Sequence, residues 1–364
     1  MTEALFYLGH PAHFHLYKNA ILSFKPEQVI VCIKSKDVLE KLLQESGIVF
    51  INIDSISSAG KKGKLIILMN FFRRMLKLQG IILKNKPKRL VGSAAELAVL
   101  GKILNIPSFI LFEDDFEKVG FFARIAGPTA TYLICPDCCS AWKWNHKKIG
   151  YPSYHELAYL HPNHFIPDRE RVEKIFDLTK RNFILRFSDL GAYHDVGKTG
   201  ITDTLASKLI SKLSEHGKVY ITSERPLSDE FEKYRIHIRA TDIHHALYYA
   251  DLFIGDSQTM TAEAAVLGTP AIRYNDFVGE LSYLEDLEKN YQLTTGVLTK
   301  DVDRLFNVVD EYLSHADLKT TWAGRRQYML AQKSDFSKNI NWILSCPAKD
   351  LKCLKKIELR DGFE

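Results

Sequence analysis

Residues 251–270 read DLFIGDSQTMTAEAAVLGTP, and this stretch decides the fold. The apolar run 252–254 predicts a buried strand, and a small polar turn, 255–259, follows it. Residues 260–267 have the pattern of a helix, which a glycine and a proline end, and 271–274 predict the next strand. This order is typical of a parallel α/β sheet. The open N–H groups and the positive end of the helix predict an anion site at the turn.

Two interpretations of this turn are open. In the first, the helix start binds an anion, and Glu263, about one turn into the helix, accepts hydrogen bonds from sugar hydroxyls. In the second, the turn is an ordinary capped helix start, with Thr259 or Thr261 as the cap.

The same alternation of strand and helix patterns continues on both sides of this stretch. Before it, strand patterns lie at 5–8, 29–33, 49–53, 89–91, 108–112, 131–135, 183–187 and 218–222. A polar segment, 161–169, reads as a linker. We therefore expect a Rossmann-like N-terminal domain at 1–163 and a Rossmann-like C-terminal domain at 164–330. A crossover helix at 331–346 and a loose, charged tail at 347–364 complete the chain.

Composition bounds the class of protein. The 364 residues are 46% hydrophobic and 26% charged, with a net charge of +5. This mildly basic balance fits anionic substrates or a membrane surface, and the basic residues lack the pattern of a nucleic-acid-binding motif. No apolar run reaches the ~20 residues of a membrane span, and residues 1–20 lack a secretory signal, so we expect a cytoplasmic protein.

Six cysteines include the pair Cys135 and Cys138. Without an export signal, disulfides are not expected. No second pair stands at a zinc-ribbon spacing, so a metal or redox role is disfavoured.

Residues 60–83 combine basic and apolar side chains in a helix pattern. The basic residues are Lys61, Lys62, Lys64, Arg73, Arg74 and Lys77. One interpretation is a patch that rests on anionic lipid at the inner membrane face or holds a lipid-linked acceptor. The other is a core helix with a solvated basic face.

The segment 188–199 contains Gly197-Lys198-Thr199, the end of a phosphate-binding P-loop motif. That motif needs four residues between its glycines, whereas Gly191 and Gly197 enclose five. An NTPase is therefore disfavoured, although the loop remains a candidate cradle for a phosphate.

Acidic and histidine side chains follow two of the predicted strands. Glu113, Asp114 and Asp115 follow an apolar strand, and like charges this close raise at least one pKa, which suits a general acid or base. A solvated acidic loop is the alternative. His10 and His13 follow the first strand, and His13 is a candidate base. Metal binding and helix capping are alternatives for these histidines.

The deciding stretch also resembles known nucleotide-binding segments. In UDP-N-acetylglucosamine 2-epimerases a D-S-G-G turn precedes a helix with E-E-A and a closing G-x-P, and the transferase that makes lipid II has a Glu at the same distance from its G-x-P. The resemblance implies that Ser257, Gln258 and Thr259 line a diphosphate and that Glu263 holds the ribose. Gln258 and Thr259 replace both turn glycines, so the backbone is expected to approach a diphosphate less closely.

Five stretches, in order and spacing, resemble an uncharacterised family of GT-B-like proteins from bacteria and archaea, the three-five-four family of domains of unknown function. They read GHPAHFHLYKNAI, FEDDFEKV, GYPSYHELAYLHPNHF, RFSDLGAYHDVGKTGI and LYYADLFIGDSQTMTAEAAVLGTPAI. The resemblance implies a GT-B-like α/β fold, in which two Rossmann-like doubly wound domains face each other across a cleft. The C-terminal helices would cross back to the first domain. It also implies a nucleotide-sugar substrate and no metal or further cofactor.

The main hypothesis is a glycosyltransferase that moves a sugar from a nucleoside diphosphate to a glycan or lipid-linked acceptor in surface polysaccharide or glycan synthesis. The alternatives are a UDP-N-acetylglucosamine 2-epimerase-like enzyme and a non-catalytic protein that binds a glycan or nucleotide. The predicted catalytic residues are His13, Asp114, Asp115 and His155. The predicted substrate-binding residues are Gly9, His10, Glu156, Arg186, Arg225, Ser257, Gln258, Thr259, Met260, Glu263 and Asn275.

Overall fold

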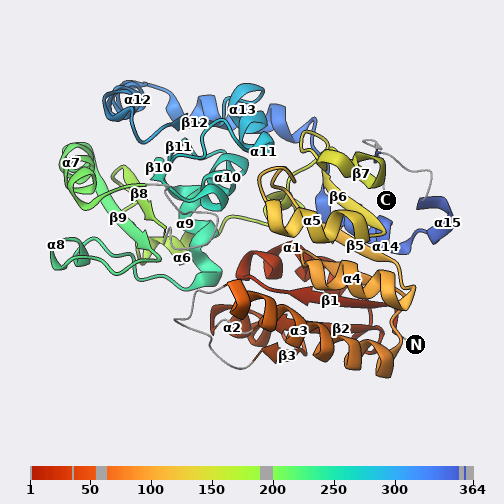
Figure 1. Ribbon diagram of the computed structural model, residues 1–364. Helices are drawn as coiled ribbons and strands as arrows, with labels where there is room; N and C mark the ends of the chain where they lie inside the picture. Colours follow the sequence, from red (N-terminus) through yellow and green to blue (C-terminus); the bar gives the residue numbers. More distant parts are fainter. Residues whose placement is uncertain (1, 35–36, 55–63, 189–199, 352–355, 358–364) are drawn as a thin grey trace. The chain divides into compact units, whose positions relative to one another are not determined.

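The computed structural model describes residues 2–34, 37–54, 64–188, 200–351 and 356–357 (Figure 1). The chain divides into two compact units. The N-terminal unit comprises Met1–Tyr159 and Ser334–Glu364, and the C-terminal unit comprises Leu160–Lys333. The sequence analysis places the corresponding boundaries after residues 163 and 330.

The N-terminal unit is built on a seven-stranded parallel sheet with the order β3-β2-β1-β4-β5-β6-β7. Its strands are β1 (Ala4–Leu8), β2 (Val29–Lys34), β3 (Ile51–Asp54), β4 (Leu90–Gly92), β5 (Ser108–Leu111), β6 (Tyr132–Pro136) and β7 (Lys148–Tyr151). The strand order reverses between β1 and β4, so this is a doubly wound sheet whose site is expected beyond the carboxyl ends of these strands. The sequence pattern predicts 131–135, which corresponds to β6, as the last strand of this unit, so β7 is a strand that it does not predict.

Helices cover both faces of this sheet (Figure 1). One face carries α1 (Pro11–Leu22), α2 (Asp37–Glu45) and α14 (Phe336–Ser345), and the other carries α3 (Lys64–Asn85), α4 (Ala95–Leu104) and α5 (Gly120–Thr129). Right-handed crossovers place helices on opposite faces once the strand order reverses. Short helices are η1 (Pro26–Gln28), η2 (Trp142–Lys147), η3 (His155–Ala158) and α15 (Ala348–Leu351).

Helix α14 returns to the N-terminal unit, as the sequence analysis expects of the C-terminal crossover. Its Phe336, Ile340 and Ile343 are buried in the core beneath α1. At its start, Ser334 N donates to Pro152 O at 2.7 Å and Ser153 Oγ donates to Ser334 O at 2.6 Å. These contacts fix the start of the helix beside the end of β7.

The prediction of a loose tail at 347–364 is wrong for the described part of this segment. Leu351 in α15 and Ile357 are both buried, and Ile357 N donates to Gly150 O in β7 at 2.8 Å. Burial of these two apolar side chains is the physical reason why this part of the chain packs on the core. Residues 352–355 and 358–364 lie outside the described residues.

Helix α3 differs from the expected core helix with a solvated basic face. Arg74 and Lys77 point inward: Arg74 Nε donates to Glu96 Oε1 at 2.8 Å, and Lys77 Nζ donates to Ile53 O at 2.7 Å. Apolar side chains instead occupy much of the outer face. Lys61 and Lys62 lie outside the described residues.

The C-terminal unit contains a five-stranded parallel sheet with the order β12-β11-β10-β8-β9. Its strands are β8 (Asn182–Phe187), β9 (Lys218–Ser223), β10 (Leu252–Gly255), β11 (Ala271–Tyr274) and β12 (Thr294–Val297). Its helices are α6 (Arg169–Glu173), α7 (Asp203–Ser214), α8 (Asp229–Glu232), η5 (Ala240–Asp242), α9 (Ile243–Tyr249), α10 (Gln258–Leu267), α11 (Ser282–Lys289), α12 (Val302–Ser314) and α13 (Leu318–Leu330). The sequence analysis did not predict β12.

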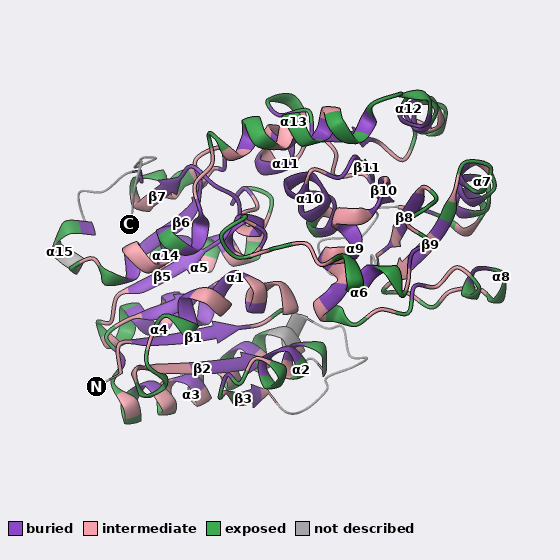
Figure 2. Ribbon diagram, turned by 180° about the vertical axis from the view of Figure 1, so that it is seen from behind, coloured by how far each residue is buried: buried purple, intermediate pink, exposed green. Residues whose placement is uncertain are grey.

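The deciding stretch forms β10, α10 and β11, and this confirms the predicted order of strand, helix and strand. Helix α10 is buried from Met260 to Leu267 (Figure 2), which its run of small residues permits. It ends at Gly268, where φ is 80°, a left-handed conformation that favours glycine. A Cβ here would also lie 2.8 Å from the Cδ atom of Arg326 in α13.

We expect Phe336→Ala to lower the free energy of unfolding by about 3–5 kcal/mol. The ring is fully buried and stacks on Tyr151 with 3.9 Å between ring centroids, so truncation leaves a cavity under the end of β7. Urea denaturation followed by circular dichroism measures the loss. Phe121→Ala, at a 55% exposed ring on α5, is the matched control and should change stability by less than about 0.5 kcal/mol. Equal effects of the two changes would contradict the assigned packing of α14.

Candidate functional site

The carboxyl ends of the central strands gather most of the predicted residues of the N-terminal unit. Residues 9–13 follow β1, and residues 112–115 follow β5. Residues 152–156 follow β7 and lead into η3. Strand ends of a parallel sheet lie along one edge, so segments far apart in the sequence come together there.

His10 and His13 fix the start of α1. His10 is the N-cap residue, and its Nδ1 accepts from Ala12 N at 3.2 Å. His13 Nδ1 accepts from Gly9 N at 3.1 Å. A neutral ring that accepts through Nδ1 carries its proton on Nε2, so it presents a donor rather than a base. The geometry of Gly9, His10 and His13 therefore fits the capping alternative better than proton abstraction.

Glu113 is the acid whose surroundings are most unusual. His155 N donates to its Oε1 at 2.8 Å, and His155 Nδ1 lies 3.5 Å from its Oε2. Behind it, Cys139 Sγ donates to the Glu113 carbonyl oxygen at 2.9 Å. The side chain is thus held by the chain that follows β7, in a site from which water is largely excluded.

Burial raises the pKa of Glu113 well above its ordinary value, and the negative charge of Glu156 raises it further. The hydrogen bond from His155 N acts in the opposite direction. Burial, with a contribution from the charge of His13, lowers the pKa of His155 to about 3. His155 is therefore neutral near pH 7, while Glu113 is shifted toward the range in which a carboxyl group exchanges protons efficiently.

The neighbouring acids have different surroundings. Asp115 is 4% exposed, and its Oδ1 accepts from Ser140 N at 2.6 Å, which ties the loop after β5 to the loop after β6. Asp114 is half-buried, and its charge contributes to the raised pKa of Glu113. All three acids are candidates for acid–base chemistry from the sequence, but the predicted catalytic residues include only Asp114 and Asp115. The position of Glu113 directly after the apolar strand was the available signal, but the opposing Glu156 comes from a distant segment.

An aromatic stack supports the site. His155 lies nearly parallel to Phe336 with 5.5 Å between centroids, and Phe336 stacks in turn on Tyr151. Among the described residues, the buried atoms Tyr151 Oη and His155 Nε2 have no hydrogen-bond partner. A buried polar atom without a partner is costly, so these two atoms make the packing around Phe336 less favourable than fully hydrogen-bonded packing would be.

Cys135, Cys138 and Cys139 lie beside this site as free thiols. Burial raises the pKa of Cys135 and of Cys139, which favours the unreactive thiol form. In the part of the chain that the structure describes, no three or more His, Cys, Asp or Glu side chains are arranged to hold a metal ion.

In the C-terminal unit, α10 begins directly after the central strand β10. Ser257 is its N-cap, with Oγ accepting from Met260 N at 3.3 Å, whereas the sequence analysis named Thr259 or Thr261 as the cap. Thr261 Oγ1 instead donates to Ser257 O at 2.6 Å. Ser257 and Gln258 are half-buried and Thr259 is exposed, so this helix start is open to a ligand. Its first turn carries no acidic side chain.

Asp256 organises the backbone below this helix start. Its Oδ1 accepts from Ser188 N at 2.7 Å and its Oδ2 accepts from Ile201 N at 3.1 Å. Asn275 Nδ2 donates to Asp256 O at 2.9 Å, which assigns Asn275 a supporting contact. Burial raises the pKa of Asp256, although these amide donors oppose the shift. The glycines and Lys198-Thr199 of the predicted phosphate cradle, between Ser188 and Ile201, lie outside the described residues.

Both candidate arginines have protein partners. Arg186 Nη1 donates to Thr222 Oγ1 at 2.8 Å, and Arg186 Nη2 pairs with Glu224. Arg225 Nη2 pairs with Asp203 Oδ1 at 2.7 Å. Arg186 therefore links the carboxyl ends of β8 and β9. Arg225 holds the start of α7 through its ion pair with Asp203.

Glu263 is more deeply buried than we expect of a side chain that binds a ribose at the protein surface. It is 6% exposed, and its Oε1 lies 3.0 Å from Nε2 of His244 in α9. Met260, another predicted substrate-binding residue of α10, is also buried. The pair of Glu263 and His244 joins α9 to α10, and a ribose would have to share that carboxylate with the imidazole.

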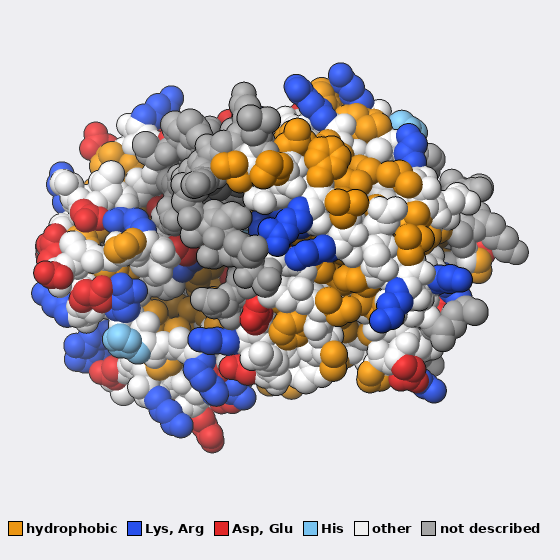
Figure 3. Space-filling model, turned by 60° about the horizontal axis from the view of Figure 1, so that its bottom comes forward, with side chains coloured by type: hydrophobic (Ala, Val, Ile, Leu, Met, Phe, Trp, Pro, Cys, Tyr) orange, Lys and Arg blue, Asp and Glu red, His pale blue; other side chains and the backbone are white. Residues whose placement is uncertain are grey.

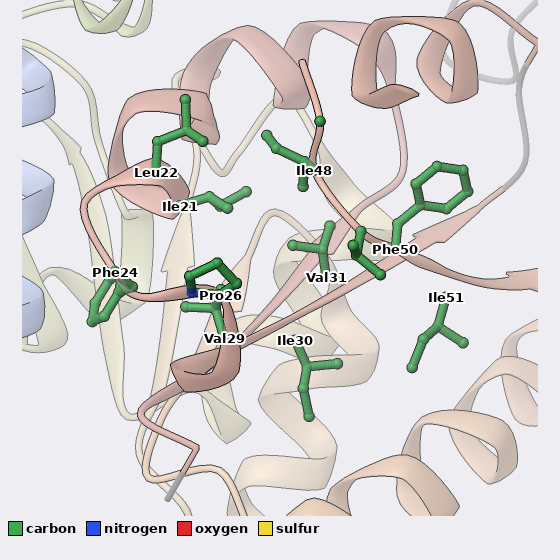
Figure 4. A pocket seen from close by; sticks show the side chains of 12 residues that line it. Ile21, Leu22, Phe24, Pro26, Val29, Ile30, Val31, Ile48, Phe50 and Ile51 are labelled. Carbon is green, nitrogen blue, oxygen red and sulfur yellow. The ribbon is translucent and has the colours of Figure 1, made fainter. Parts of the chain in front are cut away.

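The N-terminal unit also contains an apolar cavity of about 320 Å³. Ile21, Leu22, Val31, Ile48 and Phe50 surround it (Figure 4). It lies at the amino ends of β2 and β3, away from the strand ends that carry the candidate residues, and its lining contains no ionisable side chain.

The model of the family described as "Protein of unknown function (DUF354)" matches residues 6–322. No curated protein matches the chain. MnaA of S. aureus, solved with UDP, is similar at a TM-score of 0.66 and 12% identity, over 94% of this chain and 97% of that one. A UDP-N-acetylglucosamine 2-epimerase is similar at 0.63 and 11%, over 91% and 95%.

The spinosyn rhamnosyltransferase SpnG, solved with thymidine diphosphate, is similar at a TM-score of 0.60 and 11% identity, over 94% of this chain and 100% of that one. The similarities establish an α/β fold with two Rossmann-like parallel sheets, like that of GT-B enzymes. Within the described residues, no helix is both long enough and apolar enough to cross a bilayer.

The raised pKa of Glu113 predicts an unusual pH dependence of stability. Between the ordinary value of 4.5 and the raised value, the folded state keeps a proton that the unfolded state has released, so this group lowers stability as the pH rises. Glu113→Gln cannot release that proton. Its free energy of unfolding should therefore increase relative to the wild type as the pH rises above about 5.

Urea denaturation at several pH values measures this difference. Glu117→Gln, at an exposed carboxylate on the same loop, is the control and should show no such increase. A Glu113→Gln difference that is the same at every pH would mean that the carboxyl has an ordinary pKa.

Proposed function

Because this chain belongs to the DUF354 family, which is described only as being of unknown function, we propose its function from its sites. We propose a glycosyltransferase that uses a nucleoside-diphosphate sugar. The C-terminal unit binds the diphosphate, and the N-terminal unit supplies the acid–base group. The observation that carries the proposal is the half-buried Glu113, with its raised pKa, beside neutral His155 and buried Glu156.

The start of α10 is the proposed diphosphate site. It combines the positive end of a helix, the open side chains Ser257, Gln258 and Thr259, and a first turn without acidic residues. Two of the similar proteins were solved with UDP or thymidine diphosphate, which supports the proposal that this chain binds a nucleotide.

Glu113 is the proposed general base for the acceptor hydroxyl. Its carboxylate takes the hydroxyl proton as the acceptor oxygen bonds to the anomeric carbon, and the diphosphate leaves with the electrons of the broken bond. The positive helix end stabilises the charge that develops on the leaving diphosphate. A glycan or lipid-linked sugar in surface polysaccharide or glycan synthesis is the proposed acceptor.

A 2-epimerase is the second candidate, and the presence of Glu156 beside Glu113 favours it. Epimerisation at C2 requires one group to remove a proton and a group to return it. Glu156 is 2% exposed and near enough to shift the pKa of Glu113, so the site holds two carboxyl groups in a dry environment. A binding protein without catalysis is the third candidate, since Gln258 and Thr259 stand where glycines would let a diphosphate approach closely.

The donor site predicts that one nucleoside diphosphate among UDP, GDP, CDP, ADP and dTDP raises the melting temperature. A ligand at 100 times its Kd adds ~2.7 kcal/mol to the stability. Gln258→Glu should abolish the shift, because it places a negative charge at the helix start while keeping the side-chain size. A thermal-shift titration measures both proteins.

Gln44→Glu, the same change at an exposed position of α2, is the control and should bind as the wild type does. Glu263→Ala tests whether the ribose uses that carboxylate. If no nucleotide stabilises the wild type, the donor site is excluded as proposed.

Glu113→Gln should retain nucleotide binding and lose about 100-fold or more in turnover, since it removes the proton-accepting group. Turnover is followed as release of the diphosphate from the nucleotide sugar with an acceptor, and as uptake of solvent deuterium at C2 without one. Diphosphate release identifies a transferase and deuterium uptake identifies an epimerase. Neither activity in the wild type, with binding retained, would favour the non-catalytic candidate.

A further inference from the structure

The outer face of α3 is apolar over most of its length. Leu68, Met69, Phe72, Leu76 and Leu83 are between 43% and 70% exposed. Met69, Phe72, Leu76 and Leu83 recur at helical spacing on one side, whereas Phe71, Leu78 and Ile82 on the opposite side are at most 8% exposed. A helix of a soluble protein usually presents polar residues to water, so a continuous apolar face of this kind indicates an interaction surface.

Basic residues frame this apolar face. Arg73 and Lys84 on α3 and Lys102 on the adjoining helix α4 are exposed. Ile103, 62% exposed on α4, extends the apolar area. Figure 3 shows hydrophobic side chains with Lys and Arg among them on this part of the N-terminal unit. We define the outward side chains of α3, with Lys102 and Ile103, as the α3 surface.

Acidic side chains are nearly absent from these two helices. The sequence of α3 contains no Asp or Glu, and that of α4 contains only Glu96. Glu96 is 6% exposed and accepts from Arg74 Nε, so it does not contribute to the surface. The outward charge of the α3 surface is therefore positive.

The combination of an apolar face and a basic margin indicates which kind of partner binds the α3 surface. A second copy seated on the α3 surface by two-fold symmetry would bring the same positive charges together, at an electrostatic cost. A neutral apolar partner would leave the basic frame without a counter-charge. The surface of a bilayer with anionic phospholipids satisfies both features, because acyl chains accept the apolar side chains while headgroup phosphates face the Lys and Arg side chains.

We propose that the α3 surface is a peripheral membrane-binding face that docks on anionic phospholipid, with α3 lying in the plane of the interface. Phe72 and Leu76 enter the boundary between headgroups and acyl chains, and Arg73, Lys84 and Lys102 contact the headgroup phosphates. This inference does not depend on the proposed function, because neither the start of α10 nor Glu113 belongs to this surface.

Flotation of the full chain with vesicles tests it. We expect binding to vesicles with about 30 mol % phosphatidylglycerol in phosphatidylcholine, little binding to pure phosphatidylcholine, and weaker binding as salt increases. Arg73→Glu with Lys84→Glu should reduce the affinity by about 30-fold or more, since each basic residue near an anionic surface contributes about fivefold. Phe72→Ser with Leu76→Ser should reduce it by about tenfold or more.

Matched controls are Lys233→Glu and Ile166→Ser, which change an exposed base and an 82% exposed apolar side chain of the C-terminal unit. Both should bind vesicles as the wild type does. Circular dichroism melting establishes that each variant is folded, and light scattering gives its mass. The proposal is overturned if the wild type does not bind anionic vesicles, or if the control and α3 variants bind them equally well. It is also overturned if the α3 variants convert a dimer to a monomer without changing vesicle binding.

Discussion

The hydrogen bond from the His155 backbone to the Glu113 carboxylate is the contact on which the candidate chemistry depends. It joins the loop after β5 to the segment after β7, and it fixes a carboxyl group in a place where little water reaches it. Burial raises the proton affinity of Glu113, while this one donor moderates the shift. Without that donor, the carboxyl would have less reason to remain inside, since an ionised group buried without partners is strongly disfavoured.

The C-terminal crossover supports the same site. Phe336 of α14 stacks on the rings of Tyr151 and His155, so the last long helix of the chain packs against the segment after β7. A residue more than three hundred positions along the chain thereby positions groups that follow the early strands. The end of the chain accordingly belongs to the first compact unit.

The C-terminal unit uses a buried carboxylate for another purpose. The Asp256 side chain accepts hydrogen bonds from the backbone amides of Ser188 and Ile201, and Asp256 lies two residues before the start of α10. The polar residues near the start of α10 have different roles. Asp256 and Asn275 organise the backbone and Ser257 caps the helix, while Gln258 is half-buried and Thr259 is exposed. Glu263 belongs with His244 in the interior of the unit. The roles of these residues differ because their exposure differs, although they are close together in the sequence.

The sequence by itself determined the order of strands and helices around 251–270, the two Rossmann-like units and the return of the last long helix, since apolar periodicity, turn residues and helix ends are local signals. Only the tertiary structure decided that Glu156 opposes Glu113, that Ser257 caps α10 and that Arg74 and Lys77 turn inward on α3. It also placed β7 and Ile357 at an edge of the sheet. Proton affinity and exposure depend on neighbours that are distant in the chain, and a local pattern carries no information about them.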